Sequence, residues 1–253
     1  MNFTVTPVGV VRNDVKARAE MGLGGAPSVI EIAPRYRKAL EKLGEQSHVW
    51  VLGCLHRADR SVLQARPRKV SASLGLRGVF AMRSPDRPNP IALSCVRLLK
   101  VKGCRLYVDA LDMIDGTPVA DIKPYSVGID CVPAAHQPDY SRKYSLLNDA
   151  QLAVTLGRVL KNNFLHLRHA HKVAGALVFK YVRASGRAPS VQSGKLAVRG
   201  SLEIAQAVGV LFGFCCRVSR KAAIASLTVS GKRKTTVSCS GKEASAFAAL
   251  AKL

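Results

Sequence analysis

Residues 91–111 read IALSCVRLLKVKGCRLYVDAL, and this stretch decides the fold class. Ile91–Val101 is a long run of apolar and β-branched residues, and Lys102-Gly103 is a pair typical of a turn. In Leu106–Leu111, apolar residues then occupy every second position. This alternation is typical of a strand with one buried face, so the stretch predicts a β-hairpin.

Other short segments upstream of the hairpin share its β-branched or aromatic character and are bounded by Gly, Pro or Asp. They predict four further strands, at Phe3–Val11, Val29–Ile32, His48–Leu55 and Val79–Met82. One segment, Pro34–Leu43, has apolar residues at helical spacing. Many short strands and few helices favour a mainly β fold, a small barrel or closed sheet. A Rossmann cofactor site is not supported, because no strand is followed by G-x-G-x-x-G.

The composition is that of a globular protein with a polyanionic partner. Of the 253 residues, 48% are hydrophobic and 22% charged, which excludes disordered and low-complexity classes. Lys and Arg number 39 against 16 Asp and Glu, for a net charge of +23. Such an excess favours nucleic acid or an anionic surface as partner.

The same sequence predicts a cytoplasmic protein. The most apolar window, Ile204–Cys216, is shorter than the roughly 20 residues a bilayer requires, so we expect no membrane association. The N-terminus has no basic leader followed by an apolar run, so secretion is not expected. The seven cysteines include no C-x-x-C pair and are expected to be free thiols in a reducing compartment.

Charge divides the chain into two parts. Residues 1–150 carry 22 basic and 14 acidic side chains, whereas residues 151–253 carry 17 basic and 2 acidic. We therefore expect a barrel domain over residues 1–140, a linker near 136–150, and a basic α+β module over residues 150–253 that is a candidate for nucleic-acid binding. The module is predicted to contain helices at Asp149–Leu160 and Ser201–Leu211, strands at Ala222–Val229 and Lys234–Cys239, and a last helix that begins with a Ser240–Glu243 capping box.

The segment Gly78–Ile91, GVFAMRSPDRPNPI, is the first with chemical character. Its three prolines fix φ and stiffen the loop. The polar groups that it carries, Arg83, Asp86, Arg87 and Asn89, are thereby presented with little entropy left to lose on binding. A loop closed by its own Arg–Asp pairs is the structural alternative.

The second such segment, residues 109–125, reads DALDMIDGTPVADIKPY and carries four carboxylates in a protein short of acid. Clustered carboxylates bind cations, accept hydrogen bonds from ribose hydroxyls or act as bases. A metal site would need converging ligands, and the only strong ligands nearby are these hard oxygens, so we expect no metal here. A solvated acidic turn explains Asp109 and Asp121 better than Asp112 and Asp115.

Histidines flank one predicted strand. By alternation, His48, Trp50 and His56 share a face, which fits a core strand with a histidine at each end as well as a functional site. A metal-dependent hydrolase built from these histidines and the aspartates is a further alternative, although none of the spacings is a known metal motif.

These segments together resemble the TrmO (YaeB or TsaA-like) family of S-adenosylmethionine-dependent tRNA methyltransferases. The resemblance covers about residues 3–135. It rests on the motifs VGVVR from Val8, SHVW from Ser47, GVFAMRSPDRPNPI from Gly78, and LDMIDGTP through DIKPY from Leu111.

The resemblance implies a small non-Rossmann β-barrel that binds S-adenosylmethionine, methylates N6 of threonylcarbamoyladenosine at tRNA position 37, and forms a homodimer. By motif, cofactor contacts fall at Leu55, His56, Arg83, Leu93, Asp112, Met113, Ile114 and Asp115. Arg83 can pair with the methionine carboxylate. Asp112 or Asp115 is the candidate base and Lys123 or Arg87 the stabiliser of developing charge. Arg87, Asn89 and Tyr125 are the candidate substrate contacts.

One loop departs from the family pattern. The family has a Pro- and Gln-containing loop after the first strand, whereas residues 17–25 here read ARAEMGLGG. This difference keeps a second function open, that of a non-catalytic barrel that binds S-adenosylmethionine or RNA without turnover.

Overall fold

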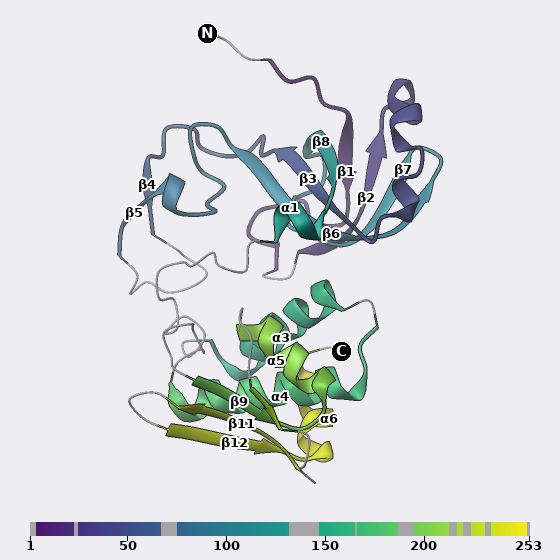
Figure 1. The fold of residues 1–253 in the computed structure, drawn as a ribbon. Coiled ribbons are helices and arrows are strands. Elements are labelled where there is room, and N and C mark those ends of the chain that lie inside the picture. Colours follow the sequence, from purple (N-terminus) through teal and green to yellow (C-terminus); the bar gives the residue numbers. More distant parts are fainter. Residues whose placement is uncertain are drawn as a thin grey trace. The chain divides into compact units, whose positions relative to one another are not determined.

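A computed structural model describes residues 4–22, 25–66, 75–131, 147–164, 166–186, 195–212, 217–219, 224–230 and 234–251. The chain forms two compact units, Met1–Cys131 and Val132–Leu253 (Figure 1). Most of the predicted linker, 136–150, lies outside the described residues. We call the two units the barrel unit and the C-terminal unit.

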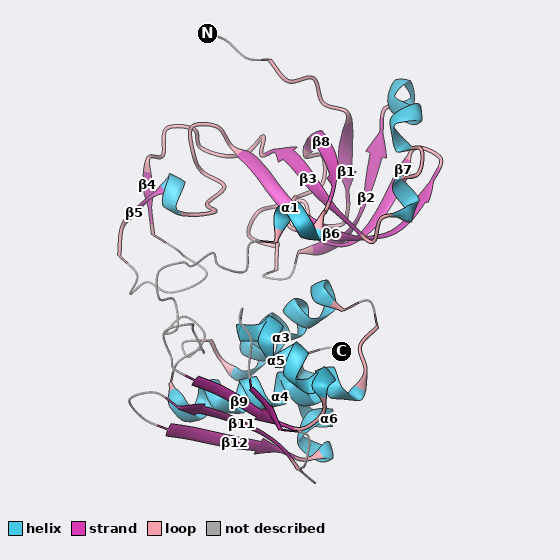
Figure 2. Ribbon diagram, viewed as in Figure 1, coloured by secondary structure: helices cyan, strands magenta, loops and turns pink. Residues whose placement is uncertain are grey.

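The barrel unit is a closed antiparallel barrel of six strands in the order β1-β2-β7-β6-β3-β8 (Figure 2). The strands are β1 (Gly9–Arg12), β2 (Ala26–Ile32), β3 (His48–Cys54), β6 (Ile91–Lys102), β7 (Arg105–Leu111) and β8 (Pro118–Pro124). The prediction of a mainly β protein with a small N-terminal barrel is therefore confirmed.

The predicted hairpin is β6 and β7. Lys102 pairs with Arg105, and Gly103 takes a φ of 60° in the turn between the strands. Side chains at alternate positions, such as Val96 and Leu98 on β6 and Leu106 and Val108 on β7, are buried inside the barrel. Because successive side chains of a strand point to opposite faces, the alternation read in the sequence becomes the barrel core.

Three sequence predictions for this unit are corrected. Val79–Met82 is a single 3-10 turn (η4, Val79–Ala81) rather than a strand. Val79 is the buried residue of this turn, so the segment lacks the alternating buried side chains of a core strand. The expected helix is a 3-10 helix, η1 (Pro34–Leu40), followed by η2 (Leu43–Glu45), because Lys42 takes a left-handed φ of 62° between them. The first strand begins at Gly9, not Phe3.

Strand β8 was missed by the sequence analysis, although it closes the barrel between β1 and β3. Its residues PVADIKP include two prolines and an aspartate, which argue against a strand in isolation. The smaller elements of the unit are β4 (Gln64–Ala65), β5 (Arg77–Gly78) and the one-turn helix α1 (Val127–Asp130).

The C-terminal unit is an α+β structure, as predicted. Its sheet has the order β10-β9-β11-β12, with β10 parallel to β9 and the other pairs antiparallel. Its elements are α3 (Asp149–Asn163), α4 (His169–Ser185), β9 (Lys195–Arg199), α5 (Leu202–Phe212), β10 (Arg217–Ser219), β11 (Ala225–Ser230), β12 (Lys234–Cys239) and α6 (Gly241–Leu250).

The predicted start of α6 is confirmed. The Ser240 hydroxyl accepts from the Glu243 backbone N–H, and the Glu243 carboxylate accepts from the Ser240 N–H at 2.7 Å. Helix α4 and strands β9 and β10 were not predicted. No helix among the described residues is both long and apolar enough to cross a membrane.

Candidate functional site

A cavity of about 890 Å³ opens at the end of the barrel where β3 ends and β6 begins. Ligand pockets are typically about 300–1,000 Å³. The lining residues come from three loops, the first positions of β6 and the 112–117 turn: Arg18, Ala19, Met21, Gly22, Leu55, His56, Arg57, Ala58, Arg83, Ser84, Pro85, Asp86, Arg87, Ile91, Ala92, Leu93, Ser94, Asp112, Ile114 and Thr117.

An ion pair joins the loop after β1, which contains Arg18, to the proline loop before β6, which contains Asp86. Both terminal nitrogens of Arg18 donate to the two carboxylate oxygens of Asp86, each at 2.8 Å. Their hydrogen bond raises the pKa of Arg18. The third loop, which follows β3, is bonded to both of the others. The Asp59 N–H donates to Asp86 at 2.9 Å, and Arg57 donates to the carbonyl of Lys16 at 2.8 Å. The loops therefore form one connected rim.

Two predicted arginines line the cavity beside this rim. Arg87 donates to the carbonyl of Val79 at 3.0 Å, and Arg83 donates to the carbonyl of Leu93. Within the described ranges, no carboxylate pairs with either guanidinium or with Arg57. These three guanidiniums keep their full charge available for an anionic ligand.

Asp112 lies on the cavity wall. Its carboxylate accepts a hydrogen bond from the Ser94 hydroxyl on β6 and is exposed. Ile114, which is buried, also lines the cavity. Asp112 is therefore positioned to accept a proton or a hydrogen bond from a bound molecule.

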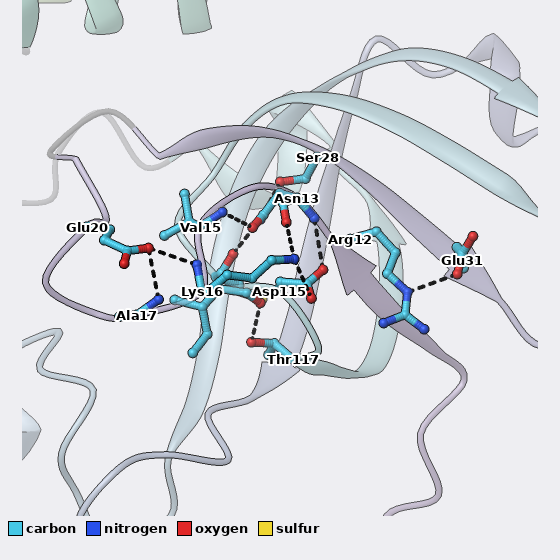
Figure 3. A network of polar contacts seen from close by, with 12 residues as sticks. Arg12, Asn13, Val15, Lys16, Ala17, Glu20, Ser28, Glu31, Asp115 and Thr117 are labelled. Carbon is cyan, nitrogen blue, oxygen red and sulfur yellow. Dashed lines mark hydrogen bonds and ion pairs between the residues drawn. The ribbon is translucent and has the colours of Figure 1, made fainter.

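Asp115, three residues on, belongs to a different network (Figure 3). Its carboxylate accepts from the backbone N–H of Asn13 at 3.1 Å and pairs with Lys16 at 2.9 Å. The hydrogen bond from Lys16 lowers the pKa of Asp115, and the N–H of Asn13 adds to that effect. Asn13 in turn donates to Ser28 and to the carbonyl of Met113, each at 2.9 Å. Asp115 thus fixes the segment after β1 to the 112–117 turn and does not line the cavity.

Four other predicted site residues also lie outside the cavity lining. Asn89 is exposed on the proline loop, and the Met113 side chain is buried in the barrel core. Lys123 pairs with Asp121 at 2.9 Å, and its backbone lies opposite Trp50. Tyr125 follows it, with its ring centroid 5.8 Å from that of Trp50.

The barrel register explains the separation of Lys123 and Tyr125 from the cavity. The N–H of Tyr125 donates to the carbonyl of His48, at the first residue of β3, whereas the cavity lies beyond the last residue, Cys54. Seven residues of strand span about 20 Å. Within one chain the structure therefore brings together Leu55, His56, Arg83, Arg87, Leu93, Asp112 and Ile114, and leaves Asn89, Met113, Asp115, Lys123 and Tyr125 apart.

The two histidines that flank β3 are separated in the same way. His56 lines the cavity, while His48 lies at the opposite end of the strand, where its ring contacts the Ser47 hydroxyl at 3.0 Å. In the part of the chain that is described, no three His, Cys, Asp or Glu side chains converge as metal ligands.

Sequence reasoning missed several cavity residues. Arg18 and Met21 belong to the loop that departs from the family pattern, and Arg57 directly follows the predicted pair Leu55-His56. Ser94 lies within β6, and no sequence motif marks it as a cavity residue. The signal that could have found Arg18 is charge complementarity with Asp86, which depends on a contact across 68 residues.

The fold and the site define a small-barrel protein with an arginine-rich ligand cavity at the rim. Residues 18–131 match the model of the tRNA-methyltransferase O N-terminal domain. The chain belongs to the TrmO family, which confirms the resemblance drawn from the motifs.

Three relatives with similar sequences illustrate the names that members of this group carry. A "probable S-adenosyl-L-methionine-binding protein" of Methanothermobacter thermautotrophicus is 44% identical over 134 residues, 51% of this chain and 95% of that protein. A "putative S-adenosylmethionine-dependent methyltransferase RcsF" of Pseudomonas aeruginosa is 38% identical over 145 residues, 54% of this chain and 60% of that protein. A mouse "tRNA (adenine(37)-N6)-methyltransferase" is 44% identical over 92 residues, 36% of this chain and 21% of the mouse protein.

Among solved structures, TrmO from Pseudomonas aeruginosa is 35% identical, with a TM-score of 0.44. The similarity covers 54% of this chain and 61% of that one.

Proposed function

We propose that the protein uses S-adenosylmethionine to methylate N6 of threonylcarbamoyladenosine at position 37 of tRNA. The observation that carries this proposal is the arginine-rich cavity on a barrel of the TrmO family. The cavity fits the cofactor chemically. Arg83, which pairs with no carboxylate among the described residues, offers its guanidinium to the carboxylate of the cofactor, and Leu55, Leu93 and Ile114 offer apolar surface to an adenine ring.

The charge of the cavity supports a second, anionic ligand. Of the described residues, four guanidiniums line it against two carboxylates, Asp86 and Asp112. The cofactor itself carries a sulfonium, an ammonium and one carboxylate, so it leaves most of this positive charge unneutralised. The threonyl carboxylate of the modified base and the adjoining phosphates supply the missing negative charge. We assign Arg87 and Arg57 to this role, because neither has a carboxylate partner within the described ranges.

Asp112 is our choice for the base. The N6 of threonylcarbamoyladenosine is a urea-type nitrogen and a poor nucleophile, so its proton must leave as the new N–C bond forms. When bound, S-adenosylmethionine supplies an electrophilic methyl group. Asp112 accepts the N6 proton, Ser94 orients its carboxylate, and the Arg87 guanidinium stabilises negative charge that develops on the adjoining carbonyl oxygen.

Transfer of labelled methyl to tRNA tests the proposal. Two tRNA preparations are compared, one with and one without the threonylcarbamoyl group, at saturating cofactor. We expect incorporation into the modified tRNA alone. Equal incorporation into both would show methylation of another acceptor and overturn the assigned substrate.

The alternative function is a barrel that binds S-adenosylmethionine or RNA without turnover. The absence of glutamine from residues 17–25 favours it, because that loop forms part of the cavity rim here. Cofactor binding by calorimetry, together with no methyl incorporation into either tRNA, would establish this alternative.

We also propose that the protein acts as a homodimer in the cytoplasm, as the family resemblance implies. Light scattering of the full chain measures its oligomeric state. A mass of 27.1 kDa would show a monomer, and twice that mass a dimer.

A further inference from the structure

Among the described residues of the C-terminal unit, helices cover one face of the sheet and leave the other face open. Helix α4 packs against β11 and β12, and α5 packs against β9 and β10 (Figure 2). The residues that face these helices, among them Val198, Leu227 and Val237, are buried. No helix or strand of the described part of the unit packs on the opposite face.

The open face is rich in hydroxyl groups. Ser226 pairs with Arg199 and Ser238, and Thr228 pairs with Ala197 and Thr236. These six residues alternate with the buried ones, and Arg199, Thr236 and Ser238 are exposed. The hydroxyls of Thr228 and Thr236 lie 3.0 Å apart across the strands. In the next row, the backbone positions of Lys195 and Lys234 both pair with Ser230.

The sequences of the four strands carry charge of one sign. The four strands contain four basic residues, Lys195, Arg199, Arg217 and Lys234, and no acidic residue. The acidic residues of the described part of the unit belong to helices and are each in an ion pair: Asp149 with Arg183, Glu203 with Arg168, and Glu243 with Lys180, at 2.5–2.8 Å. Arg199 has no ion-pair partner among the described residues.

Such a surface suits a phosphate backbone. Arg, Lys, Ser and Thr side chains make most contacts to phosphates, and they do so without reading sequence. Single-stranded RNA is bound chiefly by stacking of bases on aromatic rings, and these strands contain no aromatic residue. Strands about 4.8 Å apart make a four-stranded face about 14 Å wide, which is wide enough to contact more than one phosphate of a duplex strand.

We propose that the open face of the β10-β9-β11-β12 sheet binds the phosphate backbone of double-helical RNA, and that it holds a tRNA stem while the barrel acts on the anticodon loop. The identity of the RNA as tRNA rests on the function proposed above, whereas the preference for a duplex backbone rests on the sheet alone.

Arg199→Glu in the full chain is the first test, and Lys242→Glu is its control. Both residues are exposed and lie in the same unit, so the two variants change its charge equally, but Lys242 is on α6. Binding is measured by fluorescence anisotropy at several salt concentrations. The probes are an unmodified tRNA transcript, a 16-base-pair RNA duplex and a single-stranded oligouridylate. No cofactor is added, so the outcome does not depend on methyl transfer.

We expect Arg199→Glu to weaken tRNA and duplex binding by about tenfold or more near 0.1 M salt, and to reduce the salt slope by about 1. Lys242→Glu should have a much smaller effect. Thr236→Glu, which adds a negative charge to the same exposed surface, should reproduce the loss. Thermal unfolding checks that each variant is folded.

Three results would overturn the proposal. Equal losses in Arg199→Glu and Lys242→Glu would show that binding follows overall charge rather than this face. Tighter binding of oligouridylate than of the duplex would show a single-strand site. Unchanged tRNA and duplex binding in folded Arg199→Glu and Thr236→Glu would show that the face has another role. The function proposed for the barrel is tested separately: a parent chain that binds RNA but transfers no methyl group in the assay described above would refute that function and leave the proposal for this face intact.

Discussion

Asp112 and Asp115 are three positions apart and have different surroundings. Asp112 is exposed in the cavity and hydrogen-bonded to Ser94, whereas Asp115 is tied to Lys16 and Asn13. A base must reach the proton that it removes, and an aspartate whose pKa is lowered by an ammonium is a weaker base. The geometry therefore favours Asp112 of the two candidates.

We predict that Asp112→Asn lowers the methyl-transfer rate about 100-fold or more, because amide nitrogen cannot accept the proton. Its affinity for S-adenosylmethionine should change far less. Single-turnover transfer and calorimetry measure the two quantities. Asp115→Asn is the matched variant: it should retain the rate at saturating cofactor and lose about 1 kcal/mol of stability, since it weakens the contacts with Lys16 and Asn13. The reverse pattern would make Asp115 the base.

Gly53 on β3 has no room for a side chain, because Met113 packs against it. A Cβ at this position would lie 2.4 Å from the sulfur of Met113, a residue that is 1% exposed. We predict that Gly53→Ala destabilises the barrel by about 1–3 kcal/mol through overpacking, measured by urea unfolding. Gly78→Ala, where a Cβ meets nothing within 4 Å, is the control. A Gly53→Ala protein as stable as this control would show that Met113 moves aside freely.

We expect His171 on α4 to make the stability of the C-terminal unit depend on pH. It is 6% exposed, and its Nδ1 accepts a hydrogen bond from the Arg168 N–H at 2.8 Å. Burial is the main cause that lowers its pKa. Since the folded state binds fewer protons than the unfolded chain just below the ordinary histidine pKa of about 6.5, the free energy of unfolding should fall as pH drops through that range.

His171→Gln tests this expectation. Glutamine can accept the same backbone hydrogen bond but does not titrate. We expect the unfolding midpoint of the C-terminal unit in this variant to depend less on pH between about 5 and 7 than that of the parent chain. The same pH dependence in both proteins would assign it to another group.

At the scale of elements, three loops build the site and the strands hold it. The Arg18–Asp86 ion pair joins the segment after β1 to the proline loop before β6, and Asp59 joins the segment after β3 to the same carboxylate. The pair is partly exposed, with side chains 44% and 26% accessible, so its contribution is modest. Its position at the cavity rim matters more than its strength.

We predict that Arg18→Ala and Asp86→Ala each weaken S-adenosylmethionine binding by about fivefold, equivalent to about 1 kcal/mol, because the loops lose their common anchor. The double variant should be little worse than either single variant. Calorimetry measures all three. Arg12→Ala, which breaks the pair with Glu31 outside the cavity lining, should leave cofactor binding unchanged. Additive losses at positions 18 and 86 would mean that each residue contacts the cofactor separately.

At the scale of the whole molecule, each unit has its own core. One buried cluster is formed by barrel residues such as Val51 and Leu106, and the other by residues such as Leu177 and Leu227 of the C-terminal unit. The archaeal relative is aligned over 95% of its length with 134 residues of this chain, so a protein of little more than barrel size occurs. This independence allows the two units to be separated in experiment.

We predict that residues 1–131 alone bind S-adenosylmethionine with unchanged affinity but bind tRNA more weakly and with a shallower salt dependence. The reason is that residues 151–253 hold 17 of the 39 basic side chains and 2 of the 16 acidic ones. Calorimetry and anisotropy measure the two affinities. An unchanged salt slope would remove the C-terminal unit from RNA binding.

The sequence by itself determined the properties that depend on local pattern. Alternation over 91–111 predicted the β6–β7 hairpin, Ser240 and Glu243 predicted the start of α6, and the motifs from Gly78 and Leu111 predicted the family. Each of these signals lies within a few residues of chain, where spacing and side-chain type suffice. The excess of basic residues after position 150 is likewise a property of composition.

Only the tertiary structure decided which of the candidate residues share a site. Strand β8 has weak strand propensity and exists because β1 and β3 supply its hydrogen-bond partners. The closed register then places Lys123 and Tyr125 at the far end of β3 from Asp112, although all three belong to one motif. It also brings Arg18 to Asp86, 68 positions away. Contacts across such distances depend on barrel closure, which no local pattern encodes.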